Sequence, residues 1–205
     1  KIIIDQGYVI SNYHGLFGVY EVPWLLAQLS TVFVFLVIIN AINFIDGIDG
    51  LAITEVIKTI LIIEFFSASE TALTPLALLL VITLFPLYYF NFKKKEKVFL
   101  GDGGSLLIGT IVSIYIFYVL GEQFTFKAGY QINKVLFAVM VILYPLVDLL
   151  RVFILRIKQG KSPFEADNKH LHHLLIAKNY SHIKSIIIIE FISTLTFILI
   201  KYLIK

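Results

Sequence analysis

Long apolar runs separated by short polar segments dominate this sequence. Six runs are long enough, or nearly long enough, to cross a membrane: residues 24–43, 51–67, 73–90, 105–120, 135–157 and 183–203. A transmembrane helix needs about 20 apolar residues. Open strands would leave backbone groups unpaired in lipid, so the runs predict helices despite their abundance of Val, Ile and Phe. We therefore expect an all-α, polytopic membrane helix bundle with about six transmembrane helices.

Three of the connecting segments carry the polar residues suited to chemistry. Residues 44–50 form a tight turn rich in Gly and Asp, residues 91–105 contain a lysine cluster, and residues 158–182 are basic and contain histidines. These segments are the candidate site loops. Residues 5–22 are polar and contain Gly and Tyr, which predicts an outer loop or a short hairpin.

Composition supports a chain embedded in lipid. The sequence is 59% hydrophobic and only 15% charged, whereas soluble domains carry about 25% charged residues. It has no Cys, which excludes a disulfide framework and thiolate chemistry. A net charge of +3 gives no reason to expect a nucleic-acid partner. Because the first residue is Lys1, we expect residues 1–205 to form a single integral membrane domain that lacks its N-terminal part.

Alternation of the runs across a membrane places the three candidate loops on one side. Most of the Lys and Arg residues lie in or beside these loops, which predicts that this side is cytoplasmic. The aspartates follow the same division, since all but Asp5 fall on that side: Asp46, Asp49, Asp102, Asp148 and Asp167. One face of the protein therefore gathers both the carboxylates and most of the cations.

The first polar cluster closes the first apolar run and comprises Asn40, Asn43, Asp46 and Asp49. Spacing by three residues places these side chains on one face of a helix. The glycine that follows each aspartate lets a ligand approach the backbone closely. An Asp within a span costs about 2.5–3.5 kcal/mol on insertion scales, so we interpret the cluster as a candidate site. The alternative is a helix cap with solvated carboxylates.

The second cluster is the GDGGS sequence at residues 101–105, directly before an apolar run. Exposed backbone N–H groups at a helix N-terminus bind anions, and Ser105 suits a helix start. Asp102 is suited to hold Mg²⁺, which typically takes one or two protein carboxylates together with substrate phosphates. An ordinary N-cap role for Asp102 is the alternative. Upstream, Asn91 and Lys97 lie on the same face, and the lysines there suit anionic lipid or a nucleotide.

The third cluster begins within the fifth run, continues into the segment after it, and consists of Asp148, Arg151, Arg156, His170, His172 and His173. Asp148 and Arg151 are spaced to form an ion pair, which is also their structural interpretation. The histidines suit either Zn²⁺ or a phosphate. Without Cys and with many cations nearby, we favour phosphate. Elsewhere, we interpret His182 as an interfacial residue, and Glu64 and Glu190 as polar contacts that face the bundle.

Taken together, the three clusters predict phosphoryl transfer, which needs a metal ion, cations and positioned donors around a phosphate. They resemble the motifs of the polyprenyl-phosphate N-acetylhexosamine-1-phosphate transferases of glycosyltransferase family 4. The matching segments are NAINFIDGIDGLA at 40–52, Asn91 with KVFLGDGGS at 97–105, PLVDLLR at 145–151 and KSPFEADNKHLHHLL at 161–175. The HLHH and SPF forms resemble the GlcNAc-1-phosphate transferases more than the phospho-MurNAc-pentapeptide translocases.

The resemblance implies transfer of a HexNAc-1-phosphate, with GlcNAc expected, from a UDP-sugar to undecaprenyl or another polyprenyl phosphate. UMP is released, Mg²⁺ is the cofactor, and the site faces the cytoplasm from the bacterial inner membrane. The implied partners are UDP-N-acetylhexosamine, the polyprenyl phosphate lipid, the membrane and a second copy of the chain in a homodimer. The implied metal ligands are Asn43 and Asp102. The implied catalytic residues are Asp46, Asp49, Asp102, His172 and His173. The implied substrate-binding residues are Asn40, Asn43, Asn91, Lys97, Ser105, Arg151, Arg156 and His170.

One departure from the family and two alternatives stand beside this interpretation. The family has an Asp-Asp pair on an earlier helix, and no such pair exists in this chain; we ascribe this to a missing start. A transporter or channel would instead use carboxylates as an ion path and would bury them at mid-membrane. An inactive, scaffold-like remnant is the third interpretation.

Overall fold

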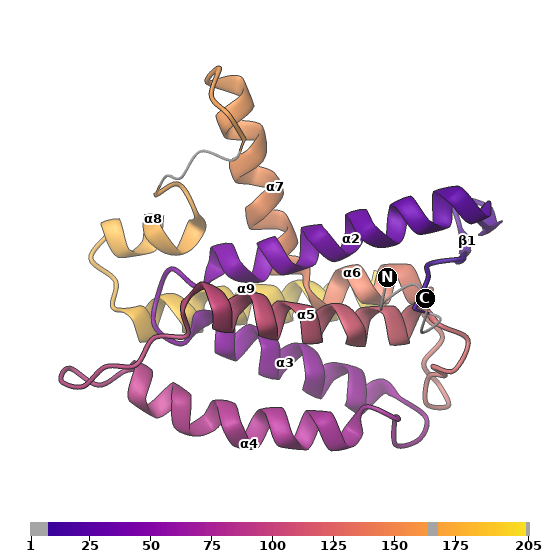
Figure 1. Ribbon diagram of the computed structural model, residues 1–205, viewed down its shortest axis with the longest axis horizontal. Coiled ribbons are helices and arrows are strands. Elements are labelled where there is room, and N and C mark those ends of the chain that lie inside the picture. Colours follow the sequence, from indigo (N-terminus) through magenta and orange to yellow (C-terminus); the bar gives the residue numbers. More distant parts are fainter. Residues whose placement is uncertain (1–7, 164–167, 204–205) are drawn as a thin grey trace.

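The computed structural model describes residues 8–163 and 168–203, and Figure 1 shows them as a helical bundle with a small hairpin at one end. An antiparallel β-hairpin is formed by β1 (Asn12–Leu16) and β2 (Val19–Glu21), as expected for this polar segment. The helices are α2 Trp24–Ile45, α3 Leu51–Phe66, α4 Thr74–Asn91, α5 Gly101–Leu120, α6 Lys134–Val141, α7 Leu143–Lys158, α8 Leu171–Ala177 and α9 His182–Leu203. The prediction of an all-α polytopic membrane bundle is confirmed. Residues 164–167, which include Asp167, lie outside the described residues.

Four helices are long and apolar enough to cross a membrane: α2, α4, α5 and α9. A fifth span arises if α6 and α7 are counted together, although they are bent by 76° at the residue between them. The remaining apolar run forms α3, which has only 16 residues. At 1.5 Å per residue, α3 is about 24 Å long, shorter than the roughly 30 Å hydrocarbon core.

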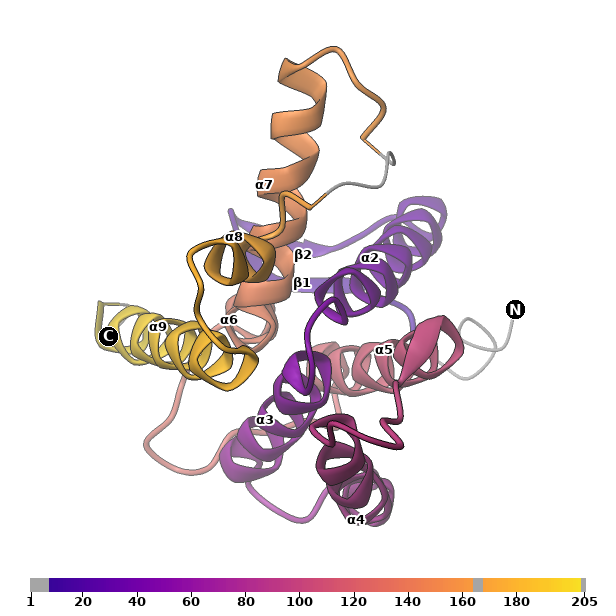
Figure 2. The ribbon, with the colours of Figure 1, turned by 90° about the vertical axis from the view of Figure 1, so that its left-hand side faces the viewer.

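One face of helix α3 is buried against the rest of the bundle, while Leu61 and Phe65 on its other face are exposed. Figure 2 shows it between α4, α5 and α9. Five of its apolar residues are completely buried: Leu51, Ala52, Val56, Ile60 and Ile63. An apolar run therefore has two explanations, a lipid-facing span or a helix at the centre of the bundle, and α3 is the second. Its buried face forms the centre of the hydrophobic core.

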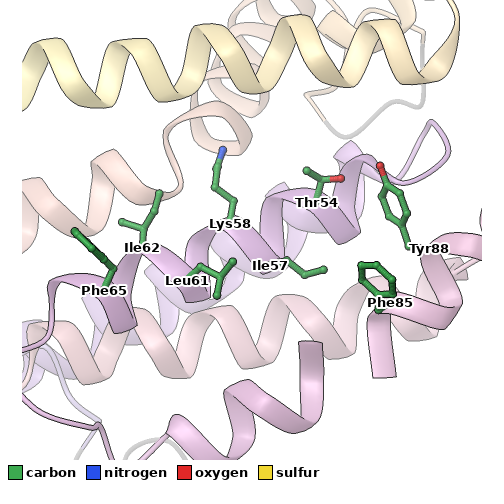
Figure 3. Close-up of a pocket in the computed structure, with 8 residues that line it drawn as sticks. All are labelled: Thr54, Ile57, Lys58, Leu61, Ile62, Phe65, Phe85 and Tyr88. Carbon is green, nitrogen blue, oxygen red and sulfur yellow. The ribbon is translucent and has the colours of Figure 1, made fainter. Parts of the chain in front are cut away.

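A polar contact inside the bundle joins α3 to α9. The Lys58 ammonium lies 2.7 Å from a Glu55 carboxylate oxygen and 2.9 Å from Glu190 on α9, and it donates to Ser193. Lys58 also lines an apolar groove of about 570 Å³ between α3 and α4 (Figure 3), where its side chain points from α3 toward α9. Glu190 therefore faces the bundle, as predicted from the sequence.

Close packing of α2 against α5 brings their ends together. A Cβ atom at Gly109 of α5 would lie 3.0 Å from the Cα atom of Ile39 of α2, so glycine favours this close approach of the two backbones. The two helices are antiparallel, and the C-terminal end of α2 lies beside the N-terminal end of α5 (Figure 1). This arrangement places the first polar cluster next to the second.

The break between α6 and α7 redirects the third cluster. Figure 1 shows α7 leaving the bundle at a steep angle, and the chain then returns to α8 at the end of the bundle where α2 stops. Pro145 lies in the first turn of α7. Because proline has no backbone N–H, it cannot donate the hydrogen bond that would continue the helix from α6. As a result, α8 and the residue before it, His170, lie next to the α2–α3 turn.

Candidate functional site

Three segments far apart in the sequence meet at one end of the bundle. They are the turn between α2 and α3, the start of α5, and α8, all on the left side of Figure 1. The closest approach is at Gly47, where a Cβ atom would lie 2.3 Å from His172 Nε2 and 3.1 Å from His173 Nε2. The absence of a side chain at residue 47 is therefore what allows the histidines to reach the turn.

Asn43 connects the end of α2 to the start of α5. Its amide donates a 2.7 Å hydrogen bond to Ser105 Oγ and lies 3.5 Å from Asp102 Oδ1. Ser105 is completely buried and donates to the backbone carbonyl of Asp102, whereas Asp102 itself is exposed. The Asp102 carboxylate is thus positioned by its neighbours and remains open to a ligand.

Asp46 carries an unfavourable charge at neutral pH. Its pKa is raised to about 7, first by burial and then by the negative charges of Asp102 and Asp49. Its carboxylate accepts no hydrogen bond from any residue that the structure describes. Asp46 and Asp102 therefore lie near enough to repel each other electrostatically, and repulsion between two carboxylates that lack a cation in contact is typical of a functional site.

Asp49, three residues farther along the same turn, is held from two directions. Its Oδ2 atom lies 2.6 Å from Lys97 Nζ in the α4–α5 loop and 2.7 Å from His182 Nδ1 at the start of α9. The sequence predicts an interfacial position for His182 and gives no indication of this contact. A single His at the start of an apolar run gives no spacing signal that would have revealed it.

Asp148 anchors the histidine segment. Its completely buried carboxylate lies 2.9 Å from Arg151, 2.8 Å from His170 Nδ1 and 2.9 Å from the backbone nitrogen of Leu171. Arg151 also donates to the backbone carbonyl of Lys169. The predicted Asp148–Arg151 pair is present, and its main effect is to fix the start of α8 and the orientation of His170.

His172 is a buried, neutral imidazole. Burial, followed by the charge of His173, lowers its pKa to about 3. Its Nδ1 atom lies 3.5 Å from the Tyr144 hydroxyl, and its ring centroid is 4.2 Å from that of His173. Nε2 faces Gly47 and has no hydrogen-bond partner among the described residues. A buried polar atom without a partner is costly, so Nε2 is suited to a ligand at the turn.

Three predicted site residues make contacts outside this cluster. Asn40 donates to the Leu36 carbonyl one turn back along α2, and Asn91 donates to the Val98 carbonyl across the lysine loop. Arg156 lies farther along α7 than Arg151 and donates to the Pro163 carbonyl. These three side chains thus bond backbone carbonyls, and among the described residues none of them is hydrogen-bonded to Asp46 or Asp102.

The donor set fits a Mg²⁺ ion that is shared with a phosphate ligand. Within residues 8–163 and 168–203, no group of three or more His, Asp or Glu residues could hold a metal ion by itself. Mg²⁺ does not need a site made entirely of protein ligands, because it is usually bound by one or two carboxylates and takes its other ligands from phosphates and water. Asp102 and Asp46 supply that minimal oxygen set.

Fold and site together define a multi-pass helical membrane protein whose polar site lies at one end of the bundle. Residues 2–120 match the profile of glycosyl transferase family 4, which is more than half of the chain. The chain belongs to this family, so the family predicted from the sequence motifs is confirmed. The third cluster lies beyond the matched residues.

Curated relatives agree with this assignment. A protein of Haemophilus influenzae named undecaprenyl-phosphate alpha-N-acetylglucosaminyl 1-phosphate transferase is 34% identical over 119 residues, which cover 56% of this chain and 32% of the relative. Its namesake in Pasteurella multocida is 35% identical over 117 residues, covering 55% and 31%. The decaprenyl-phosphate N-acetylglucosaminephosphotransferase of Mycobacterium leprae is 31% identical over 100 residues, covering 46% and 25%. The chain thus matches between a quarter and a third of the length of these relatives. No solved structure gives a significant match.

Proposed function

We propose that this protein transfers a HexNAc-1-phosphate, with GlcNAc as the sugar, from a UDP-sugar to undecaprenyl or another polyprenyl phosphate, and releases UMP. The reaction would take place at the cytoplasmic face of the bacterial inner membrane, in the synthesis of cell-envelope polysaccharides. Family membership and the names of the relatives support the reaction class. One structural observation carries the proposal: the Asp46 turn, Asp102 and His172 lie together at one end of the bundle.

The proposed reaction is an exchange at one phosphorus atom. An oxygen of the polyprenyl phosphate attacks the β-phosphorus of the donor and forms a new P–O bond. The bond from that phosphorus to the bridging oxygen breaks, and the bridging oxygen leaves with UMP. Because the transferred phosphoryl group carries dispersed negative charge, positioned donors and cations provide most of the catalysis.

The residues of the chain take distinct roles in this reaction. Asp102, with Asn43 and Asp46 beside it, would hold Mg²⁺, which when bound neutralises charge on the diphosphate oxygens. His172 is neutral, so in its Nε2–H tautomer it donates a hydrogen bond to a phosphate oxygen at Gly47. His173 lies on the same side of the turn and provides a second donor.

The test is Asp102→Asn in protein expressed from the complete gene, assayed for Mg²⁺-dependent UMP release. We expect turnover to fall by about 100-fold or more, as when a single charge-stabilising group is removed from an active site. Glu122→Gln is the matched control, because Glu122 is an exposed carboxylate just beyond the opposite end of α5. Near-native turnover of the Asp102 variant would refute the metal assignment.

A further inference from the structure

One of the side chains in contact with Asp49 comes from a distant part of the sequence. His182 is 133 residues from Asp49, and its Nδ1 atom lies 2.7 Å from Asp49 Oδ2 and 3.2 Å from the Asp49 backbone nitrogen. It lies outside residues 2–120, the region matched by the family profile. Neither the motifs nor the comparisons therefore assign it a role.

The contact joins the start of α9 to the turn between α2 and α3. The Nδ1 atom can make only one of these two contacts as a hydrogen bond, and with Nδ1 protonated it donates to the Asp49 carboxylate, which ties the start of α9 to the turn. Lys97 binds the same carboxylate oxygen from the α4–α5 loop. Asp49 is thus the point at which three separate elements meet.

Movement of this turn would change both the position of Asp46 relative to Asp102 and the packing of Gly47 against the histidines. Asp46 lies three residues before Asp49, and Gly47 is packed against His172 and His173. On the far side of the turn, Gly50 adopts a φ of 79° and packs closely against Phe92, since a Cβ atom there would lie 2.6 Å from the Phe92 ring. The position of Asp46 relative to Asp102 and His172 consequently depends on how firmly Asp49 is held.

We propose that His182 is a positioning residue for the reaction proposed above: it holds Asp49 and thereby keeps the 46–50 turn in place against Asp102 and the histidines. It has no contact with the reacting atoms. Its effect belongs to the chemical step, because misplacement of reacting groups lowers the rate even where substrate still binds. This inference rests on the proposed function for its catalytic part and on geometry alone for its structural part.

The side-chain geometry provides a matched pair of variants. Asn presents its amide nitrogen on Cγ, as His presents Nδ1, so His182→Asn retains a donor at the same distance from the backbone. His182→Gln carries the same amide one methylene farther out. Lys178→Ala is the control for a neighbouring surface change, since Lys178 is exposed at the end of α8.

The first measurement is hydrogen–deuterium exchange of the peptide that covers residues 44–54, which needs no activity. We expect His182→Gln to speed exchange in this peptide by about fivefold or more, because local opening becomes easier, while His182→Asn and Lys178→Ala match the wild type. Equal exchange in all four proteins would overturn the proposal.

The second measurement is UMP release at varied UDP-GlcNAc concentration. We expect His182→Gln to lower kcat about tenfold with a change in KM of less than about threefold, as is common for residues that orient a site residue without touching the substrate. We expect His182→Asn to have the kcat of the wild type. Faster exchange with an unchanged kcat would overturn the positioning role. If the wild-type protein releases no UMP, the proposed function fails, and the exchange result alone decides whether His182 holds the turn.

Discussion

Two regions of this protein gather carboxylates, and their surroundings differ. Inside the bundle, Glu55 and Glu190 share Lys58, whose ammonium lies within 3 Å of both. At the end of the bundle, Asp46 and Asp102 lie close together, and Asp46 has no cation in contact among the described residues. The interior cluster has one ammonium for its two carboxylates, whereas Asp46 in the terminal cluster has no cation in contact within the part of the chain that the structure describes.

We interpret the interior charges as contacts that stabilise the fold and the terminal charges as part of a ligand site. A protein that leaves like charges together gives up stability, so such an arrangement is typical of a functional site. The interior cluster also bears on the transporter alternative, which predicted carboxylates buried at mid-membrane. The bundle does contain two buried carboxylates, but Lys58 contacts both of them and donates to Ser193, so they form a link between α3 and α9.

The largest expected effect is on the interior cluster. Lys58→Met removes the cation and leaves the buried Glu55 without compensation, which should lower the free energy of unfolding by about 3–5 kcal/mol. A mixed-micelle SDS titration measures this loss. Lys94→Met, in the exposed loop before α5, should change the value by less than about 0.5 kcal/mol. Equal stability of both variants would remove the distinction between the two regions.

The opposite result is expected at the terminal cluster. Asp46→Asn replaces a carboxylate whose charged form is already disfavoured, so the free energy of unfolding should stay the same or rise slightly. Turnover should fall about 100-fold, equivalent to about 2.7 kcal/mol in the barrier. Unfolding titrations and UMP release on the same preparation test both parts. A variant that loses stability and keeps its turnover would show that Asp46 belongs with the structural charges.

The smallest expected effect concerns pH. The folded pKa of His172 is about 3 and its unfolded value is 6.5, so the unfolded chain binds the proton first. The stability that this residue contributes is complete above pH 6.5 and declines as the pH falls toward 3. By pH 5.5 the loss should be on the order of 1 kcal/mol.

Comparing the free energy of unfolding of the wild type with that of His172→Gln at each pH isolates the contribution of His172. The raised pKa of Asp46 acts in the opposite direction, since its protonation stabilises the folded state as the pH falls from about 7 to 3.8. Because Asp46 is present in both proteins, its contribution cancels in the difference between wild type and variant. A difference that stays constant from pH 8 to pH 5.5 would show that His172 is not buried as described.

Much of the fold followed from the sequence because run length and polarity are strong signals in lipid. The turn at residues 44–50 and the proximity of Asp46, Asp102 and His172 could be anticipated, since three polar clusters cannot easily lie elsewhere in a membrane bundle. The burial of α3 within the bundle could not be anticipated from composition, because a lipid-facing run and a buried run have the same composition. Length was the available signal, and Lys58 and Glu55 within the run were a second.

The bend between α6 and α7 shows a different limit. The apolar run continues through it, and Pro145 was the one local sign of a break. Yet Pro86 lies inside α4 without ending that helix, so proline alone does not decide the outcome. The role of His182 was hidden for a third reason, because long-range contacts of a single side chain leave no pattern in one sequence.

The central claim is that Asp102 and the histidines share one pocket around a divalent cation, and paramagnetic NMR tests it directly. The chain has five histidines, and His14, bonded to the Leu120 carbonyl at the far end of α5, serves as the internal control. With ¹³C-labelled His, Mn²⁺ should broaden the signals of His172 and His173 and leave His14 sharp, because α5 separates the two ends by about 30 Å. Asp102→Asn should abolish the broadening. Equal broadening of His14 and His172, or broadening that persists unchanged in the Asp102 variant, would contradict the account.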